Sequence, residues 1–248
     1  DRLCACMQPR APPTLDPMPI DPLLLKQIAL LRDFPDAALT GLAGSAMERK
    51  LVRREVVLNK GYQLQFFPFL LDGRLQGIDF TLDGREVGLY FVGPGEFFGE
   101  LSVIDRQPMA ETVIALSPSR LVLFPKEQAR ALMFSTPEVS EKVALRLAAR
   151  LRAVGSQRLL LALPNPMQRL CAQLLQLGRD AATDNAPVDN LLTIPAAPTH
   201  QEIAIMINLS RETVTRAFQQ LQNQEILRRD GAQLLILKAD ALETLSFG

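Results

Sequence analysis

The stretch THQEIAIMINLSRETVTRAFQQL, residues 199–221, holds two apolar runs of helical period on either side of a break at Asn208. Asparagine is one of the few residues besides glycine that tolerates a positive φ, so Asn208 can turn the chain sharply between two helices. Ser210 follows the break and can cap the second helix through its hydroxyl group. The stretch therefore predicts a helix-turn-helix, an arrangement whose second helix fits a DNA major groove.

The composition is typical of a packed globular protein with room for one large domain or two ordinary ones. Of the 248 residues, 48% are hydrophobic and 22% are charged. No apolar run approaches the roughly 18 residues that a membrane span requires, and the first residues lack the apolar core of a secretory signal. We therefore expect a cytoplasmic protein with no membrane partner.

The charge is balanced, with 27 lysines and arginines against 27 aspartates and glutamates. Many DNA-binding proteins carry a basic excess, which this chain lacks as a whole. Its C-terminal arginines are nevertheless concentrated at four positions, which can form a local patch for phosphate groups. These are Arg211, Arg216, Arg228 and Arg229.

Three cysteines and one histidine limit the kinds of site that the chain can form. Cys4, Cys6 and Cys171 do not make a disulfide framework, which favours a reducing compartment. A thiol redox switch at Cys4 and Cys6 stays open as an alternative function. Because His200 is the only histidine, histidine-dependent metal clusters and most catalytic triads are excluded. We expect no metal and no catalytic residue.

The pattern of the first half changes twice along the chain. Residues 1–22 are rich in proline and predict a flexible tail, and residues 23–45 have a helical pattern. From about Arg49, short apolar runs punctuated by glycines predict many short strands, as in a β-barrel or jelly roll. Leu-Asp-Gly-Arg occurs twice between such runs, at 71–74 and 82–85, and we expect a hairpin turn at each.

A helical period returns after the strands. Residues 126–135 predict a short helix, and residues 137–163 predict one long helix that ends at Pro164. A 4-3-4 spacing along the long helix favours a coiled-coil-like homodimer seam over packing against the chain's own barrel. The seam is formed by Leu147, Leu151, Val154, Arg158 and Leu161.

Residues 164–248 predict a winged helix-turn-helix. A helix that ends at Gly178, an expected C-cap, is followed by the strand-like LLTIP at 191–195. Beyond the helix-turn-helix, ILRRDGAQLLIL predicts a hairpin around Asp230-Gly231.

The order of these parts resembles the CRP/FNR family of bacterial transcription regulators. The resemblance rests on GEFFGEL at 95–101, the long helix, and HQEIAIMINLSRETVTRAF at 200–218, and it covers about residues 23–240. It implies an α+β fold with an N-terminal double-stranded β-helix (jelly roll), a long dimerisation helix and a C-terminal winged helix-turn-helix. The corresponding domains are the tail at 1–22, a cyclic-nucleotide-binding-like effector roll at 23–136, the dimerisation helix at 137–163 and the DNA-binding domain at 164–248.

The second helix of the motif carries side chains suited to reading bases. Arg211, Glu212 and Arg216 project from roughly one face. Arginine offers two donors to guanine O6 and N7, and glutamate accepts from cytosine N4. The resemblance implies that this trio reads TGTGA-like palindromes in double-stranded DNA. Thr199, His200, Gln201 and Ser210 are expected to contact phosphates, with helix capping or a solvated helix start as the alternative.

The resemblance also places an effector pocket in the roll, around Gly99, Glu100 and Leu101. Glu100 can accept from a ribose hydroxyl, and Gly99 lets the backbone approach the ligand. Cyclic AMP binders of the family place Arg-Ser or Arg-Thr about ten residues further on, where this chain has Ala110 and Glu111. Losing the arginine removes a charge-assisted contact with the cyclic phosphate, and a carboxylate beside it adds repulsion.

On the long helix, Val154-Gly155 stand where cyclic AMP binders offer Thr-Ser hydroxyls to the adenine. Two halves of the pocket thus depart from the cyclic AMP pattern, and we expect a small nucleotide effector other than cAMP. Cyclic di-GMP is one candidate, because Glu111 can bond a guanine edge. No cofactor is certain: an unidentified effector and constitutive DNA binding stay open, with a cAMP-responsive regulator as the less favoured alternative.

Other functional classes have little support in the sequence. It contains no phosphate-cradling Walker loop, metal-ligand spacing or nucleophile elbow, so we do not expect an enzyme. A nucleotide-binding module that acts on a protein partner is a second class, and the DNA-reading trio argues against it. We expect a homodimer whose effector reorients two recognition helices toward half-sites one helical turn apart, and the family implies RNA polymerase as a further partner.

Overall fold

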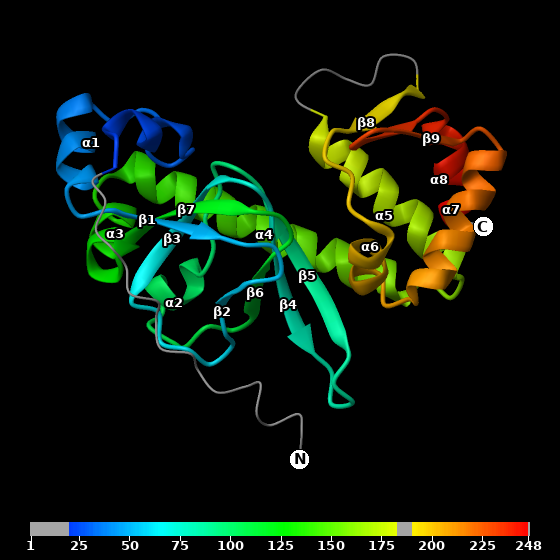
Figure 1. Cartoon of the computed structure of the whole chain (residues 1–248), viewed down its shortest axis with the longest axis horizontal. Helices are drawn as coiled ribbons and strands as arrows, with labels where there is room; N and C mark the ends of the chain where they lie inside the picture. Colours follow the sequence, from blue (N-terminus) through cyan, green and yellow to red (C-terminus); the bar gives the residue numbers. More distant parts are fainter. Residues whose placement is uncertain (1–19, 183–189, 248) are drawn as a thin grey trace. The chain divides into compact units, whose positions relative to one another are not determined.

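The computed structural model describes residues 20–182 and 190–247, which form two compact units (Figure 1). The first unit comprises Asp1–Arg85 and Leu89–Ala149, and the second comprises Glu86–Gly88 and Arg150–Gly248. Most of the predicted tail, including Cys4 and Cys6, lies outside the described residues. In the described part of the chain, no helix is both long enough and apolar enough to cross a membrane.

The segment before the first strand is less regular than the predicted helix over 23–45. It contains a short 3-10 helix, η2 (Pro22–Gln27), and one α-helix, α1 (Asp36–Ala43). Between them the backbone makes successive turns, each closed by a hydrogen bond between residues three positions apart. Leu31 N donates to Ile28 O, and Phe34 N donates to Leu31 O. Ile28 and Leu31 are both fully buried, so core packing prevails over the helical pattern at this point.

The predicted jelly roll is confirmed as two antiparallel sheets. One sheet has the order β1 (Met47–Leu51), β7 (Ser119–Pro125), β3 (Phe66–Asp72). The other has the order β2 (Val56–Leu58), β6 (Thr112–Ala115), β4 (Leu75–Phe80), β5 (Glu86–Val92).

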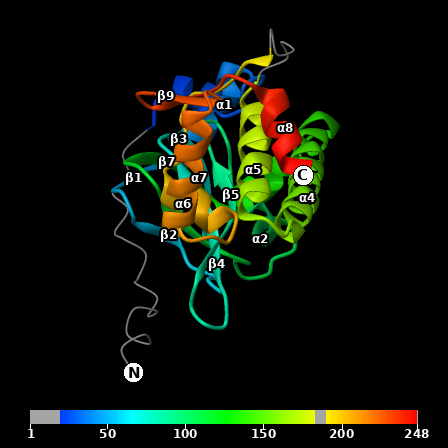
Figure 2. The same ribbon diagram turned by 90° about the vertical axis from the view of Figure 1, so that its right-hand side faces the viewer.

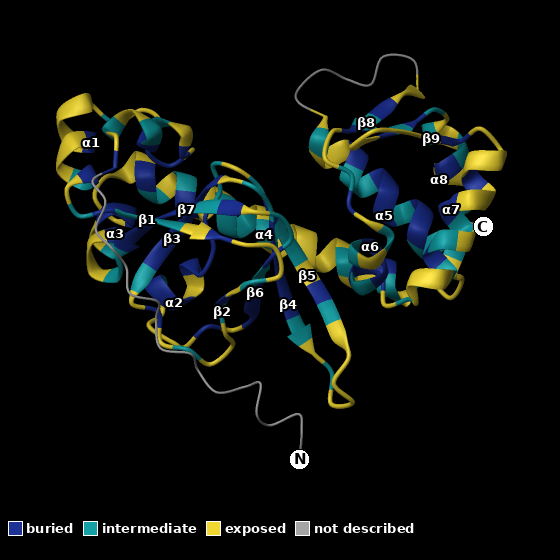
Figure 3. Ribbon diagram, viewed as in Figure 1, coloured by how far each residue is buried: buried dark blue, intermediate teal, exposed yellow. Residues whose placement is uncertain are grey.

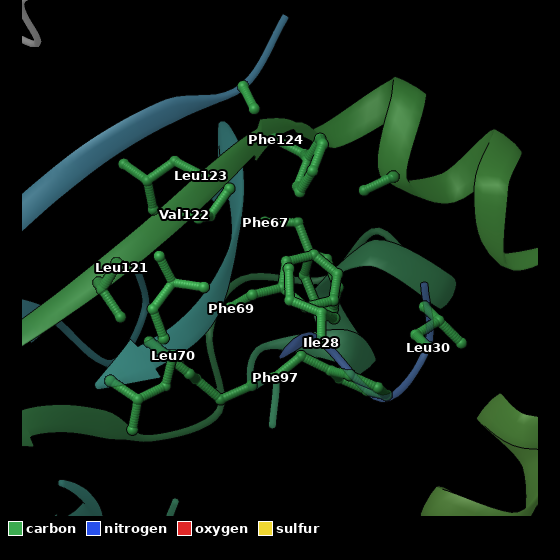
Figure 4. Packing of buried hydrophobic residues seen from close by; sticks show 14 of the residues in the cluster. Ile28, Leu30, Phe67, Phe69, Leu70, Phe97, Leu121, Val122, Leu123 and Phe124 are labelled. Carbon is green, nitrogen blue, oxygen red and sulfur yellow. The ribbon is translucent and has the colours of Figure 1, made fainter. Parts of the chain in front are cut away.

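The roll is filled by a cluster of aromatic rings from β3, β7 and the loop before residue 100 (Figure 4). Phe69 meets Phe67 at 4.9 Å and Phe124 at 5.4 Å between ring centroids, both edge to face. Phe97 lies 5.8 Å from Phe69. Such offset contacts between rings stabilise a core beyond the burial of their area, and here they tie the loop at 95–101 to the sheet.

The two Leu-Asp-Gly-Arg turns differ from each other. The turn at 82–85 joins β4 and β5, which are neighbours in one sheet, as a hairpin requires. The turn at 71–74 joins β3 and β4, which belong to different sheets, so the hairpin predicted there is wrong. Gly73 has φ +96° and lies so close to Ser119 that an added Cβ would be 2.2 Å from its Oγ. The turn crosses from one sheet to the other at a point where only glycine fits.

Three helices complete this part of the chain: one lies between β5 and β6, and two follow β7. A short helix, α2 (Glu100–Ile104), begins at the GEL segment. The predicted helices at 126–135 and 137–163 are confirmed as α3 (Lys126–Met133) and α4 (Pro137–Ala162). The first turns of α4 bury Val139 and Val143 in the roll core, while its later turns are largely exposed.

The predicted winged helix-turn-helix is also confirmed. It consists of α5 (Pro166–Ala181), β8 (Leu192–Ile194), α6 (His200–Met206), α7 (Arg211–Asn223), β9 (Leu227–Asp230) and β10 (Gln233–Ile236). The sheet order is β8-β10-β9, and β9 pairs with β10 around the expected hairpin. Sequence reasoning missed the last helix, α8 (Ala239–Phe247), which packs along α5 through the fully buried Leu242 (Figure 2).

Gly178 is not the C-cap that the sequence predicted, because α5 continues to Ala181. Gly178 is buried under the wing: an added Cβ would lie 3.0 Å from Ile236 Cδ1 and 3.1 Å from Leu192 Cβ. The absence of a side chain therefore lets α5 approach the sheet closely. The helix is instead capped at Ala182, whose N–H donates to Gly178 O and Arg179 O.

A side chain at Gly178 is expected to overpack this interface. Gly178→Val should lower the free energy of unfolding by about 1–3 kcal/mol, the usual cost of added volume in a packed core. Gly41→Ala is the control, because nothing lies within 4 Å of an added Cβ at that helical position. It should stabilise the protein by about 0.5–1 kcal/mol. Urea denaturation followed by circular dichroism measures both, and a Gly178→Val variant as stable as wild type would contradict the close approach.

Candidate nucleic-acid interface and effector pocket

The turn of the helix-turn-helix has the geometry that the sequence predicted. Asn208 adopts φ +51°, and Leu209 N donates to Ala204 O at 2.9 Å, which closes the end of α6. Ser210 Oγ then accepts from Thr213 N at 3.1 Å and caps α7. Both the positive φ and the cap arise from residues that favour them, so the start of α7 is fixed by local interactions.

The exposed face of α7 carries the trio expected to read bases. Val214, Phe218 and Leu221 form the buried face of the helix. On the outer face, Arg211, Glu212 and Arg216 are exposed and line an open hollow together with Ser210 and Thr215. Figure 3 shows α7 with an exposed, yellow side. The structure therefore brings the trio together on one solvent-facing surface.

Two of the residues expected to contact phosphate are engaged as helix caps. Thr199 Oγ1 accepts a hydrogen bond from Glu202 N at 3.3 Å. In return, Thr199 N donates to the Glu202 carboxylate at 2.9 Å. This reciprocal pair is a capping box. Ser210 caps α7 in the simpler way described above. Gln201 is exposed on the first turn of α6. A phosphate contact by these groups stays a prediction.

His200 is a packed residue and not a solvated helix start. Its ring is half-buried and stacks against Phe218, with 4.5 Å between centroids and 32° between planes. Its Nδ1 lies 3.0 Å from Thr215 Oγ1. Burial lowers the pKa of His200, and the positive charges of Arg229 and Arg211 lower it further. The neutral imidazole is therefore favoured in the folded protein.

A hydrogen bond links the long helix α4 to the helix-turn-helix. Gln157 Nε2, on α4, donates to Met206 O at 2.6 Å, at the last residue of α6. Sequence reasoning missed this contact, because a glutamine on a helix surface gives no pattern that indicates its partner. It joins the C-terminal half of α4 directly to the element that precedes the turn.

The segment at 99–101 has the backbone expected of a ligand pocket. Gly99 has φ +76° and precedes α2, whose first residue, Glu100, is fully buried. Leu101 is 45% exposed. Met109 closes on this segment: its Sδ lies 3.5 Å from Ser102 Oγ and would be 3.2 Å from a Cβ added at Gly99. The segment and the loop that leads to Ala110 are thus packed against each other.

Ala110 and Glu111 differ in their exposure. Ala110 is exposed, whereas Glu111 is 6% exposed and accepts a hydrogen bond from Tyr90 Oη at 2.5 Å. The roll unit therefore holds two buried carboxyl groups, of Glu100 and Glu111, on either side of the Met109 loop. Val154, the remaining pocket residue predicted, lies on α4 in the second unit and is 63% exposed.

Tyr90 is a partner of Glu111 that sequence reasoning missed. Its ring lies directly on the backbone of Gly77 in β4, because a Cβ added there would be 2.5 Å from Tyr90 Cζ. A glycine inside a strand often marks such a close approach, so the LQGIDF pattern of β4 was the available signal. Gly77 makes room for the Tyr90 ring, and the ring carries its hydroxyl to Glu111.

Exposure varies along the predicted dimer seam on α4. Leu151 and Val154 are 74% and 63% exposed, and Arg158 is exposed as well. Leu161 is half-buried, and Leu147 is half-buried against the roll core. The middle of the seam is thus an apolar surface in the single chain.

The described cysteine is unsuited to a redox role. Cys171 is fully buried in α5, and this burial raises the pKa of its thiol to about 12. Since the thiolate is the reactive form, Cys171 is inert at neutral pH. Among residues 20–182 and 190–247, no group of three or more histidine, cysteine, aspartate or glutamate side chains could hold a metal ion.

Comparisons with known proteins match both parts of the chain. Residues 48–136 match the model of the cyclic nucleotide-binding domain, and residues 168–245 match that of the Crp-like helix-turn-helix domain. A CRP-like cAMP-activated global transcriptional regulator of Mycobacterium tuberculosis is 30% identical over 151 residues, 61% of this chain and 66% of that protein. A cyclic AMP receptor protein of Thermus thermophilus is 29% identical over 63% of this chain and 68% of its own length.

Solved structures show the same fold at lower sequence identity. FixK2 from Bradyrhizobium japonicum superposes with a TM-score of 0.68 at 23% identity, covering 81% of this chain and 96% of FixK2. CLP, titled a c-di-GMP responsive global regulator of Xanthomonas campestris, gives a TM-score of 0.60 at 21% identity and covers 77% of this chain and 94% of CLP.

The roll and the winged helix-turn-helix, each matched by its own domain family, define a regulator with a nucleotide-binding domain and a DNA-binding domain. The chain belongs to the CRP/FNR family of transcription regulators.

Proposed function

We propose that this protein is a homodimeric regulator that reads TGTGA-like palindromes in double-stranded DNA through Arg211, Glu212 and Arg216. The observation that carries the proposal is the exposure of all three side chains on one face of a capped and firmly packed α7. Two arginines supply bidentate donors for guanines, and the glutamate between them supplies an acceptor for cytosine. A protein that reads alternating G and C needs this combination.

The proposed docking places α7 in the major groove, with phosphate contacts fixing its register. Thr199 and Ser210 are the N-cap residues of α6 and α7, where the free backbone N–H groups of a helix also favour an anion. Gln201 completes the proposed phosphate-contacting set, whereas His200, which the sequence also placed in it, packs against Phe218 and Thr215 and is left out of the proposal. The protein acts in the cytoplasm and controls transcription through RNA polymerase in this proposal, as a regulator and not as an enzyme.

The proposed homodimer forms along the exposed part of α4. Leu151 and Val154 are large apolar side chains that the single chain leaves in water, and burying each is worth about 1.5–3 kcal/mol. A parallel pairing of α4 with its copy covers both. Two-fold symmetry then presents two copies of α7 to half-sites one helical turn apart.

The effector proposed is a small nucleotide other than cAMP, with cyclic di-GMP as the candidate. Ala110 stands where cAMP binders of the family hold an arginine against the cyclic phosphate, and the buried Glu111 replaces the Ser or Thr that follows it, so the pair disfavours that anion. A guanine edge carries N–H donors that a carboxylate accepts, which suits Glu111. Relatives of this chain are named as cAMP-activated, and the structural neighbour CLP is titled c-di-GMP responsive, so both ligands belong in the test.

Removing the arginines of the trio should abolish sequence-specific DNA binding. Arg211→Ala and Arg216→Ala are each expected to weaken binding to a TGTGA-type palindrome by about 1–3 kcal/mol, roughly 5- to 150-fold. Arg179→Ala is the matched control, because Arg179 pairs with Glu243 between α5 and α8, away from the reading face. Electrophoretic mobility shifts at fixed salt measure the affinities. Equal affinity of wild type and both trio variants would overturn the proposed reading.

Charged side chains in the seam should dissociate the dimer. Leu151→Glu with Val154→Glu is expected to convert a particle of twice 27.4 kDa into the 27.4 kDa monomer. Leu145→Glu is the control, since Leu145 is 59% exposed but lies about a third of a turn from Leu151 and about half a turn from Val154 round the helix. Sedimentation velocity measures the mass. A monomeric wild type, or a control variant that also dissociates, would contradict the seam.

Calorimetric titration of the full-length protein with cyclic AMP, cyclic GMP and cyclic di-GMP tests the effector. Micromolar binding of cyclic di-GMP alone is expected, and Glu111→Gln should weaken it at least 10-fold because a neutral amide replaces a charged acceptor. Tight binding of cyclic AMP would mean that Glu111 does not exclude the cyclic phosphate. Absence of binding by all three would rule out cyclic di-GMP while leaving the DNA-reading proposal intact.

A further inference from the structure

Thr215 shares the reading surface with the trio, although its side chain has a different chemistry. It follows Arg211 by four residues on α7 and lines the same hollow as Arg211, Glu212 and Arg216. A threonine carries both a hydroxyl, which can donate or accept, and a methyl group, which can do neither. Which of the two faces the DNA decides what Thr215 can recognise.

The hydroxyl of Thr215 makes two hydrogen bonds within the protein. Thr215 Oγ1 donates to Arg211 O at 2.9 Å, which uses its only hydrogen. The same oxygen lies 3.0 Å from His200 Nδ1, so the imidazole N–H must be the donor in that contact. The proton of the neutral histidine therefore lies on Nδ1. Both hydrogen bonds involve the Thr215 hydroxyl, so the methyl group is the part of the side chain that remains for a contact outside the protein.

His200 is well placed to hold this arrangement. Its ring stacks against Phe218, which is 2% exposed in the interface between α6 and α7. Its backbone follows directly after Thr199, whose capping box with Glu202 fixes the start of α6. The imidazole therefore has little freedom to turn away from Thr215, and a partner locked by packing is what a precise site requires.

We propose that His200 is a positioning residue for base recognition: it engages the Thr215 hydroxyl so that Thr215 presents its methyl group to the DNA and selects thymine through the C5-methyl. The inference rests on the proposed DNA-reading function of α7. A methyl contact discriminates thymine from the other bases, whereas a free hydroxyl pairs with donors and acceptors alike. His200 thereby adds a fourth selected base to those that the trio reads.

Operators in which each thymine of the half-site is replaced in turn by deoxyuridine test this directly, because the replacement removes only the C5-methyl. For wild type, one such replacement should weaken binding roughly four-fold, the value of one buried methylene-sized group. Thr215→Val keeps the shape and the methyl groups and should keep that loss. Thr215→Ser has no methyl group and should bind both operators equally.

His200→Phe retains the ring on Phe218 and removes the N–H that engages Thr215. It should reduce the difference between thymine and deoxyuridine in the wild-type background, because the bond to Arg211 O is then the only one that holds the hydroxyl. In the Thr215→Val background it should leave the difference unchanged, since no hydroxyl remains to be released. A merely structural role of His200, or a contact of its own with phosphate, would weaken binding to both operators equally in both backgrounds.

Three outcomes would overturn the proposal: no deoxyuridine-sensitive thymine in wild type, loss of the sensitivity in Thr215→Val, or its undiminished persistence in His200→Phe. Thermal melting of each variant confirms that the fold is intact. If wild type binds no DNA sequence in preference to another, the DNA-reading function itself fails. Specific binding in which the thymine sensitivity is lost in Thr215→Ser but undiminished in His200→Phe would contradict only the role of His200.

Discussion

The continuity of α4 is the constraint on which both functional regions depend. Within the first unit, Arg146 forms an ion pair with Glu96 and lies 5.5 Å from the centre of the Phe97 ring, next to the GEL segment. Within the second unit, Gln157 donates to the last carbonyl of α6. Eleven residues of one helix separate these two contacts, about 16 Å at 1.5 Å per residue. One helix thus contacts the segment that precedes Gly99 and, in its later turns, the last residue of α6.

The buried face of α7 determines which side chains its exposed face presents. Val214, Phe218 and Leu221 must be buried, and this requirement alone decides that Arg211, Glu212 and Arg216 face outward. Phe218 does more than fill the core, because His200 stacks on it and reaches Thr215. The face proposed to read bases is therefore supported by a second layer of packed and hydrogen-bonded side chains, which limits the rotamers that its members can adopt.

Most of the fold could be predicted because its elements obey local rules. Asn208 favours the positive φ of the turn and Ser210 favours the N-cap, so both features can be recognised from the residue type alone. The wing hairpin follows from Asp230-Gly231. The errors occurred where distant contacts decide: Gly178 resembles a helix stop until Ile236 and Leu192 are placed above it. In the sites, residue types suited to reading bases were recognisable, whereas the bonds of Tyr90 to Glu111 and of His200 to Thr215 join residues 21 and 15 positions apart. No periodic pattern encodes such pairs.

The hydrogen bond from the half-buried Tyr90 to the buried Glu111 bears on how any effector can act. A ligand shifts a conformational equilibrium only by the difference between its affinities for the two states, and a shift from 1:99 to 99:1 needs about 5.5 kcal/mol. A single hydrogen bond to a charged group supplies only about 1.5–3 kcal/mol. Replacing the Tyr90 hydroxyl at Glu111 by a ligand donor is close to an even exchange, so that contact alone cannot switch the protein. The remaining difference must come from contacts that exist in one state only.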